Sequence, residues 1–182
     1  MVNTTKLKLT LLQQGILEFL FANAGEHFTG RAIATSLKVS QPGVSKSLPY
    51  LNKTGLITIQ KDKMSKRLSI ALNRDNSLVI GLKRANNLKQ VYESGLAGFL
   101  EDTFPGANII LFGSYSRGDD TISSDIDIAI IGSKEKYIGI GSFEKVLHRK
   151  IVLNFYTSMS KIHKELRENL CNGIVLVGGV EL

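Results

Sequence analysis

The chain has 182 residues and a formal net charge of +7, with 43% hydrophobic and 21% charged residues, the balance of an ordinary globular protein. Residues 1–100 contain 14 Lys or Arg and 5 Asp or Glu, whereas residues 101–182 contain 9 and 11. A basic half concentrates polyanions, and a half rich in carboxylates needs cations. Cys171 is the only cysteine, which excludes an intrachain disulfide and a cysteine-rich zinc site and favours the reducing cytoplasm. No segment is apolar over enough residues to span a membrane.

The N-terminal part of the sequence predicts three helices. Residues 8–23 carry apolar side chains at helical spacing. Thr29 is a suitable N-cap for a short second helix, and Ser40 for a third helix that Gly55 ends. Pro49 lies inside the third helix, where the missing N–H predicts a kink or a broken final turn.

The next segment predicts a hairpin, because Leu56–Gln60 and Arg67–Leu72 alternate apolar and polar residues around a basic tip. Three helices followed by such a hairpin are typical of a winged helix. The phrase VSQPGVSKSLPYLNKTGLITI resembles the recognition helix and first wing strand of MarR-like and ArsR-like transcriptional regulators, over about residues 10–73. The resemblance implies binding to double-stranded DNA. The residues expected to contact it are Gln41, Ser45 and Lys46 in the third helix and Lys61, Lys63, Lys66 and Arg67 around the hairpin.

Residues 77–103 repeat apolar side chains every three or four positions, which predicts one long amphipathic helix. Three roles stay open for it: joining the two halves, pairing with its copy in a homodimer, or starting the second domain. Gly95 and Gly98 indicate either close packing or a weak point. The expected organisation is a winged-helix domain at 1–76, this helix at 77–103 and a second α/β (α+β) domain with a mixed sheet at 104–182.

A phosphate-binding turn is predicted at Gly113 and Ser114, directly after an apolar strand at 107–112. Backbone N–H groups and a hydroxyl at the end of a strand suit phosphate oxygens, and a glycine lets the phosphate approach. Arg117 is suited equally to a phosphate contact and to a structural salt bridge.

A metal site is predicted at Asp125 and Asp127, because alternate residues of a strand lie on one face. Two neighbouring carboxylates repel each other, and a divalent cation that also binds substrate phosphates removes that repulsion. Asp119 and Asp120 are interpreted as solvent-facing turn residues.

The run GSYSRG followed by SDIDIAI resembles the Gly-Ser and Asp-x-Asp signature of the DNA polymerase β nucleotidyltransferase superfamily, and is most similar to its minimal nucleotidyltransferases. The resemblance implies a nucleoside triphosphate and Mg²⁺, with Mn²⁺ as a substitute, bound at Gly113, Ser114, Asp125 and Asp127. The family also supplies a third carboxylate on a later strand. Here that strand, at 151–156, contains no Asp or Glu, and Asn154 is its nearest polar candidate. An amide can ligate magnesium but cannot act as a base.

Three functions remain open on the sequence. The first is an active nucleotidyltransferase that the winged helix directs to DNA, with Asp125, Asp127 and Asn154 as the catalytic candidates. The second is a transcriptional regulator whose nucleotidyltransferase-like domain senses a nucleotide. The third is an antitoxin of the minimal nucleotidyltransferase kind with a separate toxin-like protein partner.

Overall fold

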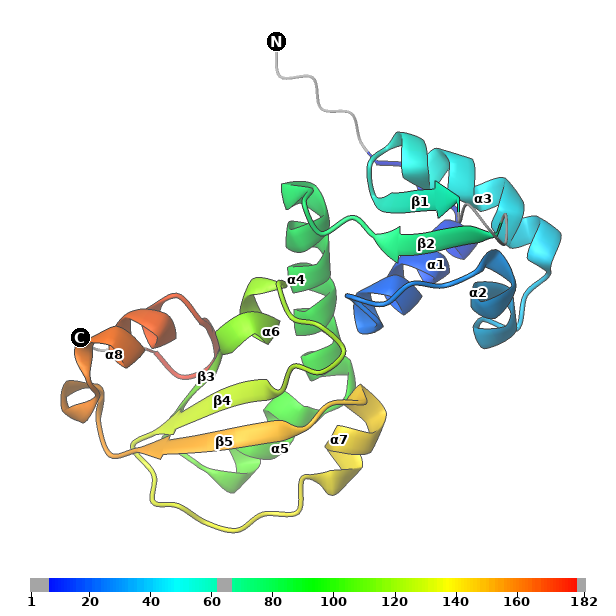
Figure 1. Cartoon of the computed structure of the whole chain (residues 1–182). Helices are drawn as coiled ribbons and strands as arrows, with labels where there is room; N and C mark the ends of the chain where they lie inside the picture. The colour runs from blue at the N-terminus through cyan, green and yellow to red at the C-terminus, as the bar shows by residue number, and fades with distance from the viewer. Residues whose placement is uncertain (1–6, 62–66, 180–182) are drawn as a thin grey trace. The chain divides into compact units, whose positions relative to one another are not determined.

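The chain divides into two compact units, Met1–Val79 and Ile80–Leu182, and the computed structural model describes residues 7–61 and 67–179 (Figure 1). The first unit contains α1 (Leu11–Ala22), α2 (Gly30–Ser36), α3 (Gln41–Lys53), β1 (Ile57–Lys61) and β2 (Leu68–Leu72). Strands β1 and β2 pair antiparallel from Ile57 opposite Leu72 to Lys61 opposite Leu68. Three helices followed by this hairpin form a winged helix, as the sequence predicts.

The helices of the first unit begin at side-chain caps. The Thr10 hydroxyl accepts a hydrogen bond from the Gln13 N–H at 3.2 Å, and the Gln13 side chain accepts one from the Thr10 N–H at 2.9 Å. Thr29 and Ser40 cap α2 and α3 through their hydroxyls, each of which accepts a backbone hydrogen bond at 3.2 Å. Both predicted caps are therefore confirmed, and each satisfies an N–H that the helix itself leaves unpaired.

Helix α3 continues through Pro49 to Lys53, so its final turn is not broken, and a kink at Pro49 stays a prediction. The missing N–H of Pro49 removes a hydrogen bond to the carbonyl of Ser45. Ser45 is exposed, and water can satisfy that carbonyl. The last turn closes through the Thr54 N–H, which donates to the Tyr50 carbonyl at 3.0 Å.

The segment before α2 is bound to the hairpin. Phe28 and Ile70 exchange two backbone hydrogen bonds of 2.8 Å, which adds a short bridge to the edge of β2. The Phe28 ring also packs edge-on against Phe19 of α1, with ring centroids 4.8 Å apart. These contacts fix the hairpin against the helices that precede the recognition helix.

The second unit is built on a mixed four-stranded sheet in the order β5-β4-β3-β6. β3 is antiparallel to both of its neighbours, whereas β4 and β5 are parallel. The elements beyond α4 (Ser77–Glu93), whose first residues belong to the first unit, are α5 (Leu96–Thr103), β3 (Asn108–Phe112), α6 (Gly113–Arg117), β4 (Ile126–Ile131), α7 (Gly141–Leu147), β5 (Ile151–Tyr156), the 3-10 helix η1 (Met159–Lys161), α8 (Lys164–Cys171) and β6 (Ile174–Val177).

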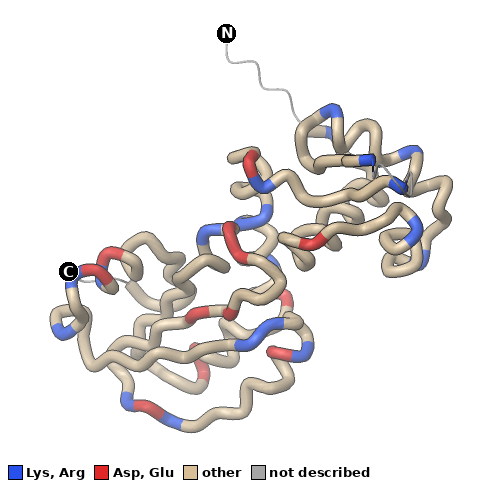
Figure 2. The backbone as a smooth tube through the Cα atoms, in the orientation of Figure 1, with Lys and Arg blue, Asp and Glu red and all other residues tan. Residues whose placement is uncertain are grey.

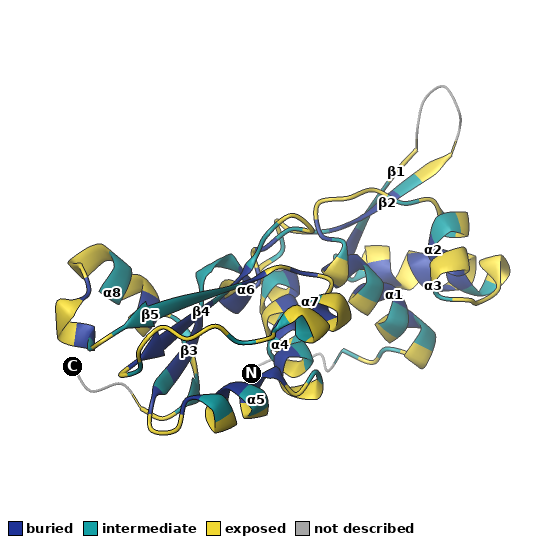
Figure 3. Ribbon diagram, turned by 90° about the horizontal axis from the view of Figure 1, so that it is seen from below, coloured by how far each residue is buried: buried dark blue, intermediate teal, exposed yellow. Residues whose placement is uncertain are grey.

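Both faces of this sheet are covered, as the apolar strands predict (Figure 3). On one face, Ile126, Ile128 and Ile130 pack in a core that includes residues of α5 and α7. On the other face, Ala129 and Ile131 pack with residues of η1 and α8. The central strands are thereby held rigidly from both sides.

The predicted single helix over 77–103 is wrong, because the helix is broken between Glu93 and Leu96. Gly95 has φ +79°, a left-handed conformation that ends α4 and starts α5 in a new direction. The buried residues of α4 are Val79, Lys83, Asn87 and Val91, while Tyr92, which the apolar pattern places inside, is exposed. None of the described helices is both long and apolar enough to cross a membrane.

Candidate functional site

Gly113 follows β3 directly and begins α6 with φ +73°. A Cβ at this position would collide with the Asp127 carboxylate, and it would lie 3.2 Å from the Asp127 Cγ. The close approach follows from the sheet, since Phe112 pairs with Asp127 across β3 and β4. Only glycine fits this turn, both in conformation and in space.

Asp127 lies in β4, and Asp125 is the residue that immediately precedes this strand. Burial raises the pKa of the Asp127 carboxyl above its usual value, and the negative charge of Asp125 raises it further, whereas Arg117 lowers it. The charges of Asp125 and Arg117 therefore both act on Asp127.

Arg117 also forms a salt bridge with Asp119. Its Nε lies 3.1 Å from Asp119 Oδ2, and both side chains are about half exposed, at 49% and 48%. An exposed pair of this kind is weak, so a phosphate can displace it at little cost.

Asn154 lies on β5, beside Ala129 in the parallel register, and Val152 lies beside Asp127. Because paired residues of neighbouring strands share a face, Asn154 is on the same face as Ala129 and Asp127, one strand away. Its amide lies 3.5 Å from the Val152 carbonyl. Among residues 7–61 and 67–179, no group of three or more His, Cys, Asp or Glu could hold a metal ion, so a third carboxylate is not found there.

Tyr156, two residues beyond Asn154, is also electrostatically coupled to the site. Burial raises the pKa of its hydroxyl, and the charge of Asp127 raises it further. The tyrosine therefore remains a neutral hydrogen-bonding group near the carboxylates at neutral pH. The sequence pattern alone does not single it out, because a tyrosine at a strand end is common in sheet cores.

The interpretation of Asp120 as a solvent-facing residue is wrong. Its exposed fraction is 1%, and its carboxylate forms a buried ion pair with Lys83 of α4. Asp119 is exposed, as predicted. Burial and the charge of Asp120 raise the pKa of the neighbouring Tyr115 to about 12, and Arg149 opposes the shift.

The signal for this cluster is present in the sequence at helical spacing. Lys83 and Asn87 are four residues apart, with Val79 and Val91 a further four residues out on either side, so all four share one face. A lysine and an asparagine between buried valines indicate an internal polar contact only when the partner is known. That partner lies 37 residues away, and no local pattern connects the two.

In the first unit, the predicted DNA-contacting residues Gln41, Ser45 and Lys46 are all exposed on α3. Lys61 and Arg67 are exposed at the base of the hairpin, and Lys63 and Lys66 lie outside the described residues. Lysine and arginine are plentiful on this unit (Figure 2).

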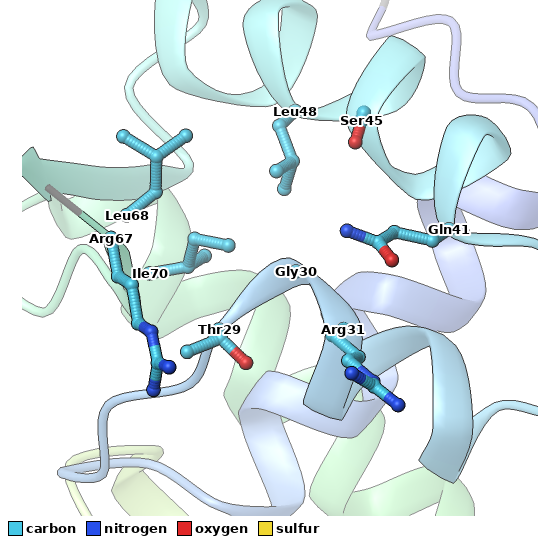
Figure 4. A pocket seen from close by; sticks show the side chains of 9 residues that line it. All are labelled: Thr29, Gly30, Arg31, Gln41, Ser45, Leu48, Arg67, Leu68 and Ile70. Carbon is cyan, nitrogen blue, oxygen red and sulfur yellow. The ribbon is translucent and has the colours of Figure 1, made fainter. Parts of the chain in front are cut away.

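Gln41, Ser45 and Arg67 also line a pocket of about 400 Å³ between α2, α3 and β2 (Figure 4). Arg31, from α2, is a lining residue that the sequence pattern does not single out. Figure 4 shows the Gln41 side chain reaching into the pocket, with the two arginines at its margin. The pocket thus lies between α3 and the hairpin, and its lining includes the guanidinium groups of Arg31 and Arg67 and the amide of Gln41.

Comparison with known proteins gives one family for the second unit. Residues 93–177 match the family model described as "Nucleotidyltransferase domain". A search of curated proteins found no match.

Similar solved structures include three bacterial regulators. The adhesin competence repressor of Streptococcus pyogenes is 22% identical, with 53% of this chain and 69% of that chain covered and a TM-score of 0.41. The zinc-responsive MarR family member ZitR of Lactococcus lactis is 24% identical, with 57% and 68% covered and a TM-score of 0.41. MepR of Staphylococcus aureus, a regulator of a multidrug efflux pump, is 24% identical in its complex with DNA, with 52% and 65% covered and a TM-score of 0.39.

The chain therefore spans about two thirds of the length of these regulators. The winged helix itself is evident from the order of its helices and its hairpin. Residues 93–177 thus match a nucleotidyltransferase domain, and this stretch follows the winged-helix unit in the chain.

Proposed function

We propose that the second unit binds a nucleoside triphosphate with a divalent cation and transfers a nucleotidyl group to a hydroxyl, with pyrophosphate leaving. The observation that carries the proposal is the direct apposition of Gly113 and the Asp127 carboxylate, with the charge of Asp125 close enough to act on Asp127. The backbone turn at Gly113, which has no side chain, therefore lies directly against the Asp127 carboxylate. The match of residues 93–177 to the nucleotidyltransferase domain family supports the same chemistry.

The donor set fits Mg²⁺ or Mn²⁺. Burial, and after it the charge of Asp125, raises the pKa of Asp127, and a divalent cation would stabilise the two charged carboxylates. Asp125 and Asp127 would hold the cation, and Asn154 is the nearest further oxygen donor on the face of Asp127. Once bound, the cation would stabilise charge on the triphosphate.

The chain's own groups account for binding and orientation. The Gly113 turn and the Ser114 hydroxyl would receive phosphate oxygens, since α6 begins at this point. Arg117 would exchange its weak pair with Asp119 for a phosphate. Proton removal from the acceptor hydroxyl has no carboxylate on β5 to perform it, because β5 reads IVLNFY.

The test for transfer uses the full chain with each of the four labelled ribonucleoside triphosphates and Mg²⁺ or Mn²⁺. Pyrophosphate release and label transfer are measured, with the Asp125→Ala, Asp127→Ala double variant as the background. Activity above that background supports an enzyme. Equal signals in the two proteins mean that catalysis is not the function.

A second function is favoured by Asn154, which stands on the site face where a carboxylate would be required for a base. In this case the domain senses a nucleotide, and the winged helix binds duplex DNA through Gln41, Ser45, Lys46 and the basic residues of the hairpin. Affinity for DNA should then fall steeply with salt and change when a triphosphate is added. DNA binding that ignores both would remove this alternative.

A further inference from the structure

A buried polar cluster lies beside the candidate site and belongs to none of its proposed ligand-binding groups. Lys83 and Asn87 come from α4, and Asp120 comes from the loop that joins α6 to β4. Their exposed fractions are 1%, 4% and 1%. Such deep burial of three polar side chains requires an explanation beyond solubility.

The three side chains connect three segments of the second unit. The Lys83 ammonium is ion-paired with Asp120 Oδ1, and the Asn87 amide donates to the same oxygen at 2.7 Å. The Asn87 amide also donates to the Tyr115 carbonyl in α6 at 2.9 Å. Hydrogen bonds and an ion pair thereby attach α4 both to α6 and to the loop that leads to Asp125.

The backbone of Gly118 also approaches α4 closely, at Arg84, three residues before Asn87. Gly118, which ends α6 with φ +83°, lies so near α4 that an added Cβ would be 2.7 Å from the Arg84 backbone nitrogen. The backbone after Arg117 is therefore seated directly on α4. The contact at Gly118 and the buried cluster both fix this stretch of chain against α4.

The far end of the loop is closed by its own turn. The Thr121 N–H donates to the Ser124 hydroxyl at 3.0 Å, and the Ser124 N–H donates to the Thr121 carbonyl at 3.1 Å. Asp125 comes next in the chain. With Asp120 anchored at one end and this turn at the other, the loop has little freedom to vary the position of Asp125.

Stability alone does not account for a buried ion pair at this place. Apolar side chains of similar volume are often as stabilising or more so, because burying two charges is costly. Asp120 Oδ2 is buried and has no hydrogen-bond partner among the described residues, so the cluster does not have the arrangement that would give the greatest stability. Its directional bonds instead define one geometry for the loop and for α6.

We propose that Lys83, Asn87 and Asp120 are positioning residues of the nucleotide site. They hold α6 and the 118–125 loop in the arrangement that brings Arg117 and Asp125 beside Asp127. The inference rests on the proposed nucleotide binding, and it adds to that proposal a set of residues that touch no substrate.

The test compares the full chain with a Lys83→Met, Asp120→Leu double variant, which removes both charges and replaces the two residues with apolar side chains of similar branching. Asp120→Asn is the second variant, since it keeps the shape and removes one charge. The matched control is Lys89→Met, Glu93→Leu, an exposed pair on the same helix. Thermal unfolding, amide hydrogen exchange of residues 119–125, and the Kd of a nonhydrolysable triphosphate with Mn²⁺ are measured for each.

We expect the double variant to remain folded while loop exchange accelerates at least tenfold and the triphosphate Kd rises at least tenfold. The control should change neither. A folded double variant whose loop exchange and Kd stay within twofold of the original overturns the proposal. If the double variant does not fold, Asp120→Asn is judged by the same two limits.

Failure of the proposed function has a different signature. If the original chain binds no triphosphate, the nucleotide assignment is lost, whereas loop exchange still decides whether the cluster fixes the loop. Unchanged exchange in a chain that does bind triphosphate rejects the positioning role alone.

Discussion

At the residue scale, the charge on Asp127 opposes folding of the metal-free protein. Burial and Asp125 raise its pKa from 3.8, so its contribution to stability is full below that value and is lost as the pH rises through the higher folded pKa. Asp127→Asn should therefore raise the thermal midpoint at neutral pH in metal-free buffer, and the gain should vanish near the unfolded pKa. The same variant should lose Mn²⁺-dependent triphosphate binding.

Thermal unfolding across this pH range, with and without Mn²⁺, checks the prediction, and Asp102→Asn on the exposed part of α5 is the control. A lower midpoint for Asp127→Asn at neutral pH would show that the carboxylate is stabilised by the fold. The site would then have no electrostatic reason to attract a cation.

Gly113 gives a second prediction at this scale. A side chain at φ +73° costs about 1–2 kcal/mol in backbone strain, and the collision with Asp127 adds to it. Gly113→Ala should thus destabilise the chain by more than about 1 kcal/mol in denaturant unfolding and should weaken triphosphate binding. Gly139→Ala, where an added Cβ meets nothing within 4 Å, is the matched control and should be near neutral. Equal effects at both positions would contradict the geometry.

At the scale of elements, local signals predict what local physics determines. Thr29 and Ser40 begin helices because a hydroxyl satisfies a nearby N–H, and β4 and β5 follow apolar runs that suit a buried sheet. The break at Gly95 is visible in the sequence only as an ambiguity, since a glycine in a helical pattern marks either close packing or an end. Tertiary packing decides between the two.

The role of Asp120 cannot be predicted from its neighbours. Asp119 and Asp120 are identical residues in one turn, yet the first is exposed and the second is buried against α4. The difference depends on Lys83 of α4. The apolar spacing of this helix does not predict that the face carrying Lys83 is the buried one. Long-range charge pairing of this kind is invisible to periodicity.

The ion pair makes a prediction for α4 as an element. Lys83→Met alone leaves the Asp120 carboxylate buried without its cation and should cost about 3–5 kcal/mol in unfolding free energy. Adding Asp120→Leu should recover most of the loss, because the uncompensated charge is removed. Denaturant unfolding of the two variants gives both values. A single variant as stable as the double variant would mean that Asp120 becomes protonated or solvated without its partner.

At the scale of the whole molecule, the uneven distribution of charge along the chain indicates two kinds of partner. The excess of Lys and Arg in residues 1–100 belongs mainly to the winged-helix unit, and the carboxylates of the candidate site belong to the second unit. The division between the compact units falls at Val79 and Ile80 and assigns most of α4 to the second unit. The assignment matters because Lys83 and Asn87 then belong to the unit whose loop they bind.

The two units should accordingly respond to salt in different ways. If the first unit binds duplex DNA through phosphate contacts, the logarithm of its affinity falls linearly with the logarithm of the salt concentration. Lys46→Ala and Arg67→Ala should each reduce that slope by about 1 and should leave the triphosphate Kd unchanged. Lys164→Ala, an exposed cation at the start of α8, should alter neither quantity. Fluorescence anisotropy of a labelled duplex between low and moderate salt measures the slopes. Slopes that are unaffected by Lys46 and Arg67 would remove both from the DNA-binding surface, because a lysine or arginine that binds a phosphate releases counterions and one that faces solvent does not.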